Sequence, residues 1–256
     1  MGIKIGVIGV GVIGSSIING FCSDGDKNNE MYLSPRNKQN VDNLAGKYEN
    51  INKCESNQEV LDKSEWIIIS VVPSKGEEIL RNLKFRKNHK VINLMSDKKL
   101  EDIKVWIGET KILCHMVPLS FIENRRGPIV LFPENSEVKN LFSELGEVIE
   151  VNSRQKVETL ATITGLMTSY YKLISEVTNW GSENGLSKKE SFDYTTSFFS
   201  ALSYKANISK EEGLKKLASE MTKGGLNEMA IKNIEKSNGI ELWKNSLDLI
   251  LERFKK

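Results

Sequence analysis

The sequence predicts an α/β protein, with a Rossmann-type, doubly wound sheet at residues 1–152 and an all-helical domain at residues 153–256. Three observations lead to this prediction. A glycine-rich strand, turn and helix pattern opens the chain, short apolar runs then alternate with helical stretches, and beyond about residue 153 only helical periodicity remains. No flexible linker separates the two parts.

The opening stretch predicts a dinucleotide site. A β-branched strand leads to Gly9, Gly11 and Gly14, in the spacing GxGxxG, and then to an apolar helix. Gly9 permits the tight turn, Gly11 lets a pyrophosphate approach the backbone, and Gly14 lets the helix lie close to the strand. The pattern also suits a strand-to-helix corner without a ligand, but its context favours a cofactor bound by these glycines and by Val12 and Ile13 at the helix start.

The end of the second strand indicates which dinucleotide binds. About 20 residues after Gly14, where an acidic residue would bind the ribose of NAD, the chain has Ser34-Pro35-Arg36 and no carboxylate. Arginine offers a charge-assisted fork and serine a hydroxyl to a 2′-phosphate. We therefore predict NADP(H) rather than NAD(H), with a surface arginine after a turn proline as the alternative.

The rest of the first domain alternates between strands and helices. The run at 66–72 is apolar throughout, as in a strand buried on both faces of a parallel sheet, and its carboxyl end at residues 70–74 should lie over the cofactor. Ser56, with Glu59 three residues on, and Ser136 are expected to cap helices. The other expected strands and helices are strands at 90–95, 111–117, 128–132 and 148–151, and helices at 38–48, 56–62, 98–106 and 136 to about 146.

The second domain has the signals of several helices. Apolar residues recur at helical spacing from Val157 to Val177, which predicts one long amphipathic helix. Capping boxes at 187–190 and 209–212 begin further helices, a glycine pair interrupts them, and a final helix is expected at 243–254. The aromatic content exceeds what a small bundle needs for its own core, so we expect a second subunit to cover part of it.

Composition argues against several classes of function. The 36 Lys and Arg residues balance 34 Asp and Glu residues and are interspersed with them, so no basic field indicates nucleic acid or an anionic membrane. Cys22, Cys54 and Cys114 have neither CxxC spacing nor neighbouring histidines, so we expect free thiols and no metal. The apolar start is too short for a membrane span and has no basic region like that of a signal peptide, so we expect a cytoplasmic protein.

In five segments the sequence resembles the pyrroline-5-carboxylate reductase family, over essentially the whole chain. The family segments are GxGxMG, S-x-R, A-V-K-P, R-x-M-P-N-T-P and T/S-P-G-G-T-T. The corresponding residues, in the same order and spacing, are 9–14, 34–36, 70–73, 115–121 and 222–227. The resemblance implies an NADP(H)-dependent enzyme that dimerises through its helical domain, with the substrate between the nicotinamide and that domain, partly in contact with the second subunit. It also implies cofactor contacts from Val71, Val72 and Pro73.

Departures from the family pattern fall near the implied substrate site. Leu119 replaces the polar Asn of M-P-N-T-P, Lys223 replaces a proline, and Leu226 replaces a threonine of P-G-G-T-T. The family's G-S-G-P is reduced to Thr164-Gly165-Leu166-Met167. These changes leave cofactor binding intact and somewhat favour a substrate other than pyrroline-5-carboxylate.

The implied reaction is hydride transfer to the C=N carbon of a small cyclic imine carrying a carboxylate. A protonated imine is already an electrophile, so the protein mainly has to position it beside the nicotinamide and needs no nucleophile of its own. The resemblance implies a carboxylate site at Gly224 and Gly225, with Thr222 and Asn227 adding hydrogen bonds and Pro118 also bordering the substrate; a plain helix-to-helix turn is the alternative.

The two histidines and an arginine pair complete the candidates. His115 is expected either to donate a proton near neutral pH or to be a hydrogen-bonded wall residue. His89, beside Arg86 and Lys87, is expected to be solvated. The pair at 125–126 is expected to lie at the surface, with contact to a substrate or phosphate anion as the alternative.

Three functions remain open. The first is a pyrroline-5-carboxylate reductase that makes proline. The second is a relative that uses NADPH to reduce a different imine or carbonyl compound. The third is a cofactor-binding regulatory protein without turnover.

Overall fold

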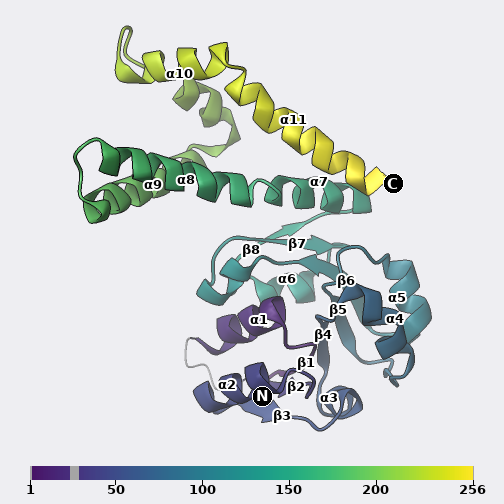
Figure 1. Ribbon diagram of the computed structural model, residues 1–256. Helices are drawn as coiled ribbons and strands as arrows, with labels where there is room; N and C mark the ends of the chain where they lie inside the picture. Colours follow the sequence, from purple (N-terminus) through teal and green to yellow (C-terminus); the bar gives the residue numbers. More distant parts are fainter. Residues whose placement is uncertain (1, 24–28, 256) are drawn as a thin grey trace. The chain divides into compact units, whose positions relative to one another are not determined.

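The computed structural model describes residues 2–23 and 29–255. By internal contacts the chain divides into two compact units, Met1–Val157 and Glu158–Lys256, and the division falls inside one helix. Figure 1 shows the helices and strands of both units.

The first unit is built on one eight-stranded sheet in the order β3-β2-β1-β4-β5-β6-β7-β8. All neighbours in this order are parallel except β6 and β7, which are antiparallel. The strands are β1 (Lys4–Ile8), β2 (Glu30–Leu33), β3 (Ile51–Lys53), β4 (Trp66–Ile69), β5 (Lys90–Asn93), β6 (Ile112–Val117), β7 (Pro128–Phe132) and β8 (Glu147–Glu150). The order reverses direction between β1 and β4, so the predicted doubly wound sheet is confirmed.

Helices cover both faces of this sheet (Figure 1). They are α1 (Val12–Cys22), α2 (Lys38–Lys47), α3 (Asn57–Lys63), α4 (Pro73–Arg81), α5 (Leu100–Ile107) and α6 (Ser136–Phe142), with a 3₁₀ turn η1 (Ser120–Asn124). One core cluster joins the sheet to α1, α2 and α6, and the other joins it to α3, α4 and α5. In β4, Ile68 belongs to the first cluster and Ile67 and Ile69 to the second, so this strand is buried on both faces as predicted.

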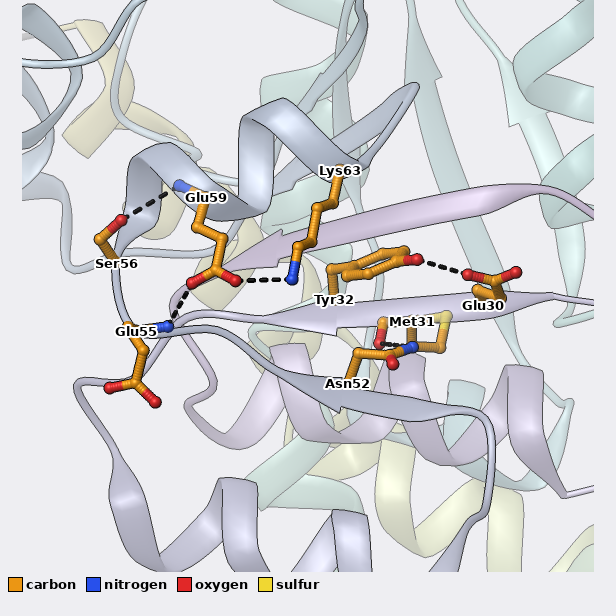
Figure 2. Close-up of polar contacts among 8 residues, drawn as sticks. All are labelled: Glu30, Met31, Tyr32, Asn52, Glu55, Ser56, Glu59 and Lys63. Carbon is orange, nitrogen blue, oxygen red and sulfur yellow. Dashed lines mark hydrogen bonds and ion pairs between the residues drawn. The ribbon is translucent and has the colours of Figure 1, made fainter.

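Helix α3 begins with the predicted cap (Figure 2). The Ser56 hydroxyl accepts a hydrogen bond of 3.1 Å from the Glu59 backbone N–H. The Glu59 carboxylate in turn accepts from the Glu55 N–H at 2.7 Å and lies 2.6 Å from the Lys63 ammonium. The two hydrogen bonds satisfy backbone N–H groups at the helix start, where donors have no intrahelical partner.

Several details of the first unit differ from expectation. Strand β3 was not predicted, because a three-residue edge strand with one apolar residue carries no periodic signal. Asn135, rather than Ser136, caps α6: its side chain accepts from the Val138 N–H at 3.1 Å. That helix ends at Phe142, earlier than expected.

His89 is fully buried, so the expectation that it is solvated is wrong. Its Nδ1 accepts from the Arg86 N–H at 3.0 Å, and its Nε2 lies 3.1 Å from the Leu61 carbonyl oxygen. The Arg86 guanidinium also donates to carbonyls at the end of α3, among them that of Ser64 at 2.8 Å. The loop before β5 therefore closes onto α3 instead of extending into solvent.

The described part of the second unit contains helices and no strand. Its elements are the end of α7 (Arg154–Thr164), α8 (Met167–Glu183), α9 (Lys188–Ser219), α10 (Leu226–Lys236), α11 (Gly239–Glu252) and a 3₁₀ turn η2 (Arg253–Lys255). The capping box of Ser187 and Glu190 is confirmed at the start of α9. Lys210, at φ 57°, interrupts α9 close to the second expected box, but the Glu212 side chain lies outside the described residues.

The expected continuous helix from Val157 to Val177 is wrong. It is divided into α7 and α8 at Gly165, whose N–H bonds to the Thr162 carbonyl three residues back at 3.0 Å. The Thr164 hydroxyl also donates to the backbone carbonyl of Ala161. Periodicity could not reveal this break, because the apolar spacing continues across it.

Candidate functional site

The three glycines of the opening turn meet the requirements predicted for them. Gly9 has φ +97°, and a Cβ there would lie 2.4 Å from the Ser70 carbonyl oxygen. A Cβ at Gly14 would lie 2.5 Å from the Gly9 carbonyl oxygen, so α1 starts close against the turn. A Cβ at Gly11 would meet nothing within 4 Å. The space above Gly11, at the start of α1, is therefore open to a ligand.

Two side chains fix this turn from neighbouring elements. The Gly9 N–H donates to the Ser34 hydroxyl at 2.9 Å, and the Asn40 amide of α2 donates to the Val10 carbonyl at 2.9 Å. Ser34 is only 1% exposed. Ser34 therefore holds the glycine turn in place, a contact that its predicted role as a ribose-reading hydroxyl did not include.

A cavity of about 370 Å³ lies on one side of the turn. It extends from the glycines past the end of β2, and among its lining residues Arg36 and Lys38 are cationic and none is acidic. The lining residues are Ile8, Gly9, Val10, Gly11, Ser34, Arg36, Asn37, Lys38, Asn57, Ser70, Val71, Val72 and Ile79. We call this the adenosine-side cavity.

A second cavity, of about 360 Å³, adjoins the first. Both are bordered by Gly11, Ser70, Val71 and Val72, so they form one crevice across the carboxyl ends of β1 and β4. The second cavity is lined by Gly11, Val12, Ile13, Ser70, Val71, Val72, Pro73, Leu94, Ser96, Val117 and Pro118. We call it the nicotinamide-side cavity.

The crevice suits a dinucleotide. Each half has a volume in the range of small-molecule sites, the bare backbone at Gly11 stands where the halves meet, and the positive end of α1 begins there. The structure brings together all of the predicted cofactor-binding residues: Gly9, Gly11, Val12, Ile13, Gly14, Ser34, Arg36, Val71, Val72 and Pro73. Pro118, predicted to border the substrate, lies in the nicotinamide-side cavity.

His115 is a buried residue of strand β6. It is 5% exposed in β6, and its Nδ1 is 3.1 Å from the Asn93 amide nitrogen of β5. Burial, with a smaller effect of the Arg154 charge, lowers the pKa of His115 to about 4. The imidazole is therefore neutral at pH 7, which gives no support to the predicted proton donor and fits the alternative of a hydrogen-bonded wall residue.

The predicted substrate residues of the second unit form a tight turn before α10. Gly224 has φ +72°, the Gly225 N–H donates to the Thr222 carbonyl at 2.8 Å, and Gly225 is the N-cap of the helix. The Gly224 N–H donates to the Glu228 carboxylate at 2.5 Å. Asn227 lies in the first turn of α10. A carboxylate of the chain itself thus already binds one of the N–H groups predicted to bind a substrate carboxylate.

Arg125 and the three cysteines, the remaining candidates, make contacts or are buried within the first unit. The Arg125 guanidinium donates to the Gly20 carbonyl at 3.0 Å. Cys22, Cys54 and Cys114 are buried free thiols, and burial raises their pKa values to about 11, 11 and 12. Within residues 2–23 and 29–255, no cluster of three or more His, Cys, Asp or Glu side chains could hold a metal ion. In the same ranges no helix has both the length and the apolar character that a bilayer crossing requires.

Sequence reasoning missed four polar residues of the crevice. Asn37, Lys38 and Asn57 line the adenosine-side cavity, and Ser96 lines the other. Asn57 is the first residue of α3 and Ser96 follows β5. Each stands just past the end of a strand or at the start of a helix, where ligands of parallel sheets bind, and that position was the available signal.

Comparison with known proteins agrees with this geometry. Residues 4–97 match the model of the family described as "NADP oxidoreductase coenzyme F420-dependent". No curated protein matches the sequence.

Solved structures match the whole chain. A pyrroline-5-carboxylate reductase from Streptococcus pyogenes has a TM-score of 0.83 at 19% identity, covering 99% of this chain and 98% of that one. The enzyme from Coxiella burnetii has a TM-score of 0.83 at 21% identity, with 98% and 97% covered. The Plasmodium falciparum enzyme with NADP bound has a TM-score of 0.80 at 19% identity, with 99% and 97% covered. The chain therefore has the pyrroline-5-carboxylate reductase fold, as its five sequence segments predicted.

Proposed function

We propose that this protein is an NADP(H)-dependent reductase of a small cyclic imine, with pyrroline-5-carboxylate as substrate and proline as product. The observation that carries the proposal is the crevice at the start of α1, with an open Gly11 at its middle and two unopposed cations at its adenosine end. A fold shared with reductases of this substrate, and a family model described by NADP, support it.

NADP(H) is the cofactor that these residues fit. The first turn of α1 would hold the diphosphate, because backbone N–H groups at a helix start have no intrahelical partner and the helix dipole is positive there. Arg36 would contact the adenosine half, and the absence of an acidic residue among those lining the cavity favours a phosphorylated ribose.

Once bound, the nicotinamide supplies the hydride, and the chain supplies position and exclusion of water. Val12 and Val72 are 75% and 60% exposed and border the nicotinamide-side cavity together with Val117. These apolar walls suit a flat ring and leave little room for ordered water. Ser70 and Ser96 are the serines among its lining residues, so their hydroxyls are donors that this cavity could offer to a bound substrate.

Oxidation of NADPH by the purified full chain with pyrroline-5-carboxylate tests the proposal directly. We expect absorbance at the reduced nicotinamide band to fall and proline to form. Arg36→Gln should weaken NADPH binding far more than NADH binding. Tight NADPH binding without oxidation by any cyclic imine would instead support a regulatory protein without turnover.

A second candidate is reduction of a different imine, and the Glu228 contact favours it. This carboxylate accepts from the Gly224 N–H at 2.5 Å and lies 2.7 Å from the Lys232 ammonium. These two partners lower the pKa of Glu228, so it is charged near neutral pH and opposes a second carboxylate there. Lys223 and Leu226, which depart from the family pattern, stand in the same turn.

The two substrates can be separated by their carboxylates. A pyrroline-5-carboxylate reductase should act on that compound far more efficiently than on 1-pyrroline, which has the same ring without the carboxylate. The second candidate predicts the reverse preference, or activity on neither compound and turnover of another imine.

We also propose that the protein is a homodimer or a dimer-based oligomer formed through the helical unit. Aromatic side chains of α8 and α9 are exposed within the single chain: Tyr170, Tyr171, Trp180, Phe192, Tyr194, Phe198 and Tyr204. Apolar surface of this kind marks interaction sites. Light scattering should show at least a dimer, and a well-folded monomer at micromolar concentration would refute this part of the proposal.

A further inference from the structure

Two cations line the adenosine-side cavity, and the protein neutralises neither of them. Arg36 and Lys38 border the cavity, and no acidic side chain does. Within the described residues neither has a carboxylate within 4.0 Å. Lys53, by comparison, has its ammonium 3.0 Å from Asp42. Solvent alone therefore balances both charges at the cavity.

Lys38 extends from a part of the backbone that is held at the cavity. It is the first residue of α2, after the N-cap Asn37, whose side chain accepts from the Asn40 N–H at 3.3 Å. The Asn40 amide donates to the Val10 carbonyl at 2.9 Å, which ties the first turn of α2 to the glycine turn. The α carbon of Lys38 is thus fixed beside the space that an adenosine ribose would fill.

The charge of the expected ligand requires more than one cation. A phosphate monoester carries a charge of about −2 near neutral pH, and Arg36 supplies only one positive charge. We propose that Lys38 is a second specificity-determining residue, which together with Arg36 binds the 2′-phosphate of NADP(H). This inference rests on the proposed function. It assigns the second charge to a residue outside the segments that resemble a known family.

Binding titrations of the full chain test the assignment without reference to turnover. Nicotinamide fluorescence reports NADPH and NADH binding, and calorimetry reports 2′,5′-ADP and 5′-AMP, which differ in the phosphate alone. Lys38→Gln should weaken NADPH and 2′,5′-ADP about five- to tenfold and change NADH and 5′-AMP less than about twofold. Lys99→Gln, at an exposed lysine before α5, is the matched control and should change none of them.

Salt dependence provides a second measurement. Because added salt screens the attraction between the ammonium and the phosphate, NADPH binding to the unmodified chain should weaken more steeply with salt than binding to Lys38→Gln. Equal salt dependence would count against the assignment. So would unchanged NADPH affinity in Lys38→Gln while Arg36→Gln loses it. If the unmodified chain binds neither dinucleotide, the proposed function itself fails, and this inference fails with it.

Discussion

Acidification should destabilise the first unit through His115, which is buried and uncharged between β5 and β6. Its pKa is lowered from 6.5 to about 4 by burial and, to a smaller extent, by Arg154. The unfolded chain therefore binds a proton on this residue at higher pH than the folded chain does. Stability that is complete above about pH 6.5 is then lost as the pH falls toward about 4. For one histidine the loss between about pH 7 and about pH 5 is about 2 kcal/mol.

Hydrogen exchange of the β5 and β6 amides, measured at both pH values, reports the stability of this unit separately. His115→Gln keeps a hydrogen-bonding side chain beside Asn93 but does not titrate. The variant should lose about 2 kcal/mol less between the two pH values than the unmodified chain, whatever its stability at pH 7. A loss of equal size in both proteins would refute the assignment of a neutral, buried His115.

Four further substitutions follow from local contacts or their absence. Gly14→Ala puts a Cβ 2.5 Å from the Gly9 carbonyl and should cost about 1–3 kcal/mol in urea unfolding, whereas Gly11→Ala meets no protein atom within 4 Å and should leave stability unchanged while weakening NADPH binding. Ser34→Ala leaves the Gly9 N–H without its acceptor at 2.9 Å and should lower stability by about 1–3 kcal/mol and weaken the cofactor in titrations. Ser187→Ala removes the capping box of α9 and should cost about 1 kcal/mol in thermal unfolding.

The cofactor crevice could be predicted because its requirements are local in sequence. The tight turn, the open approach and the helix start all fall between Gly9 and Gly14. Backbone geometry demands glycine at positions 9 and 14, and Gly11 leaves open the space that a ligand would fill. The lack of an acidic residue beside Arg36, which favours NADP(H), can likewise be read from a few consecutive residues of the sequence. The strands of the sheet other than β3 were predictable because they contain apolar runs, such as 66–69, that are buried on both faces of the sheet.

Contacts between distant segments could not be predicted in the same way. The burial of His89 depends on the end of α3, and the hydrogen bond of Asn40 depends on the glycine turn 30 residues earlier. The antiparallel pairing of β7 with β6 leaves no trace in periodicity, since both strands are equally apolar. The hydrogen bond from the Gly224 N–H to Glu228 could not be predicted either, because acidic residues are common in the first turn of a helix whether or not they bind a preceding loop.

The nicotinamide-side cavity has no charged side chain among its lining residues. Its walls are apolar apart from the glycine backbone and the hydroxyls of Ser70 and Ser96, and no lining residue carries a positive charge. A hydroxyl can orient an imine but cannot neutralise a carboxylate, which requires a cation or several aligned N–H groups. The first unit can therefore hold the ring of the cofactor without distinguishing a carboxylated imine from a plain one. Because the proposed substrate site includes the turn at Gly224 and Gly225, exchanging its neighbours Lys223 or Leu226 is expected to alter substrate preference while leaving NADPH affinity unchanged.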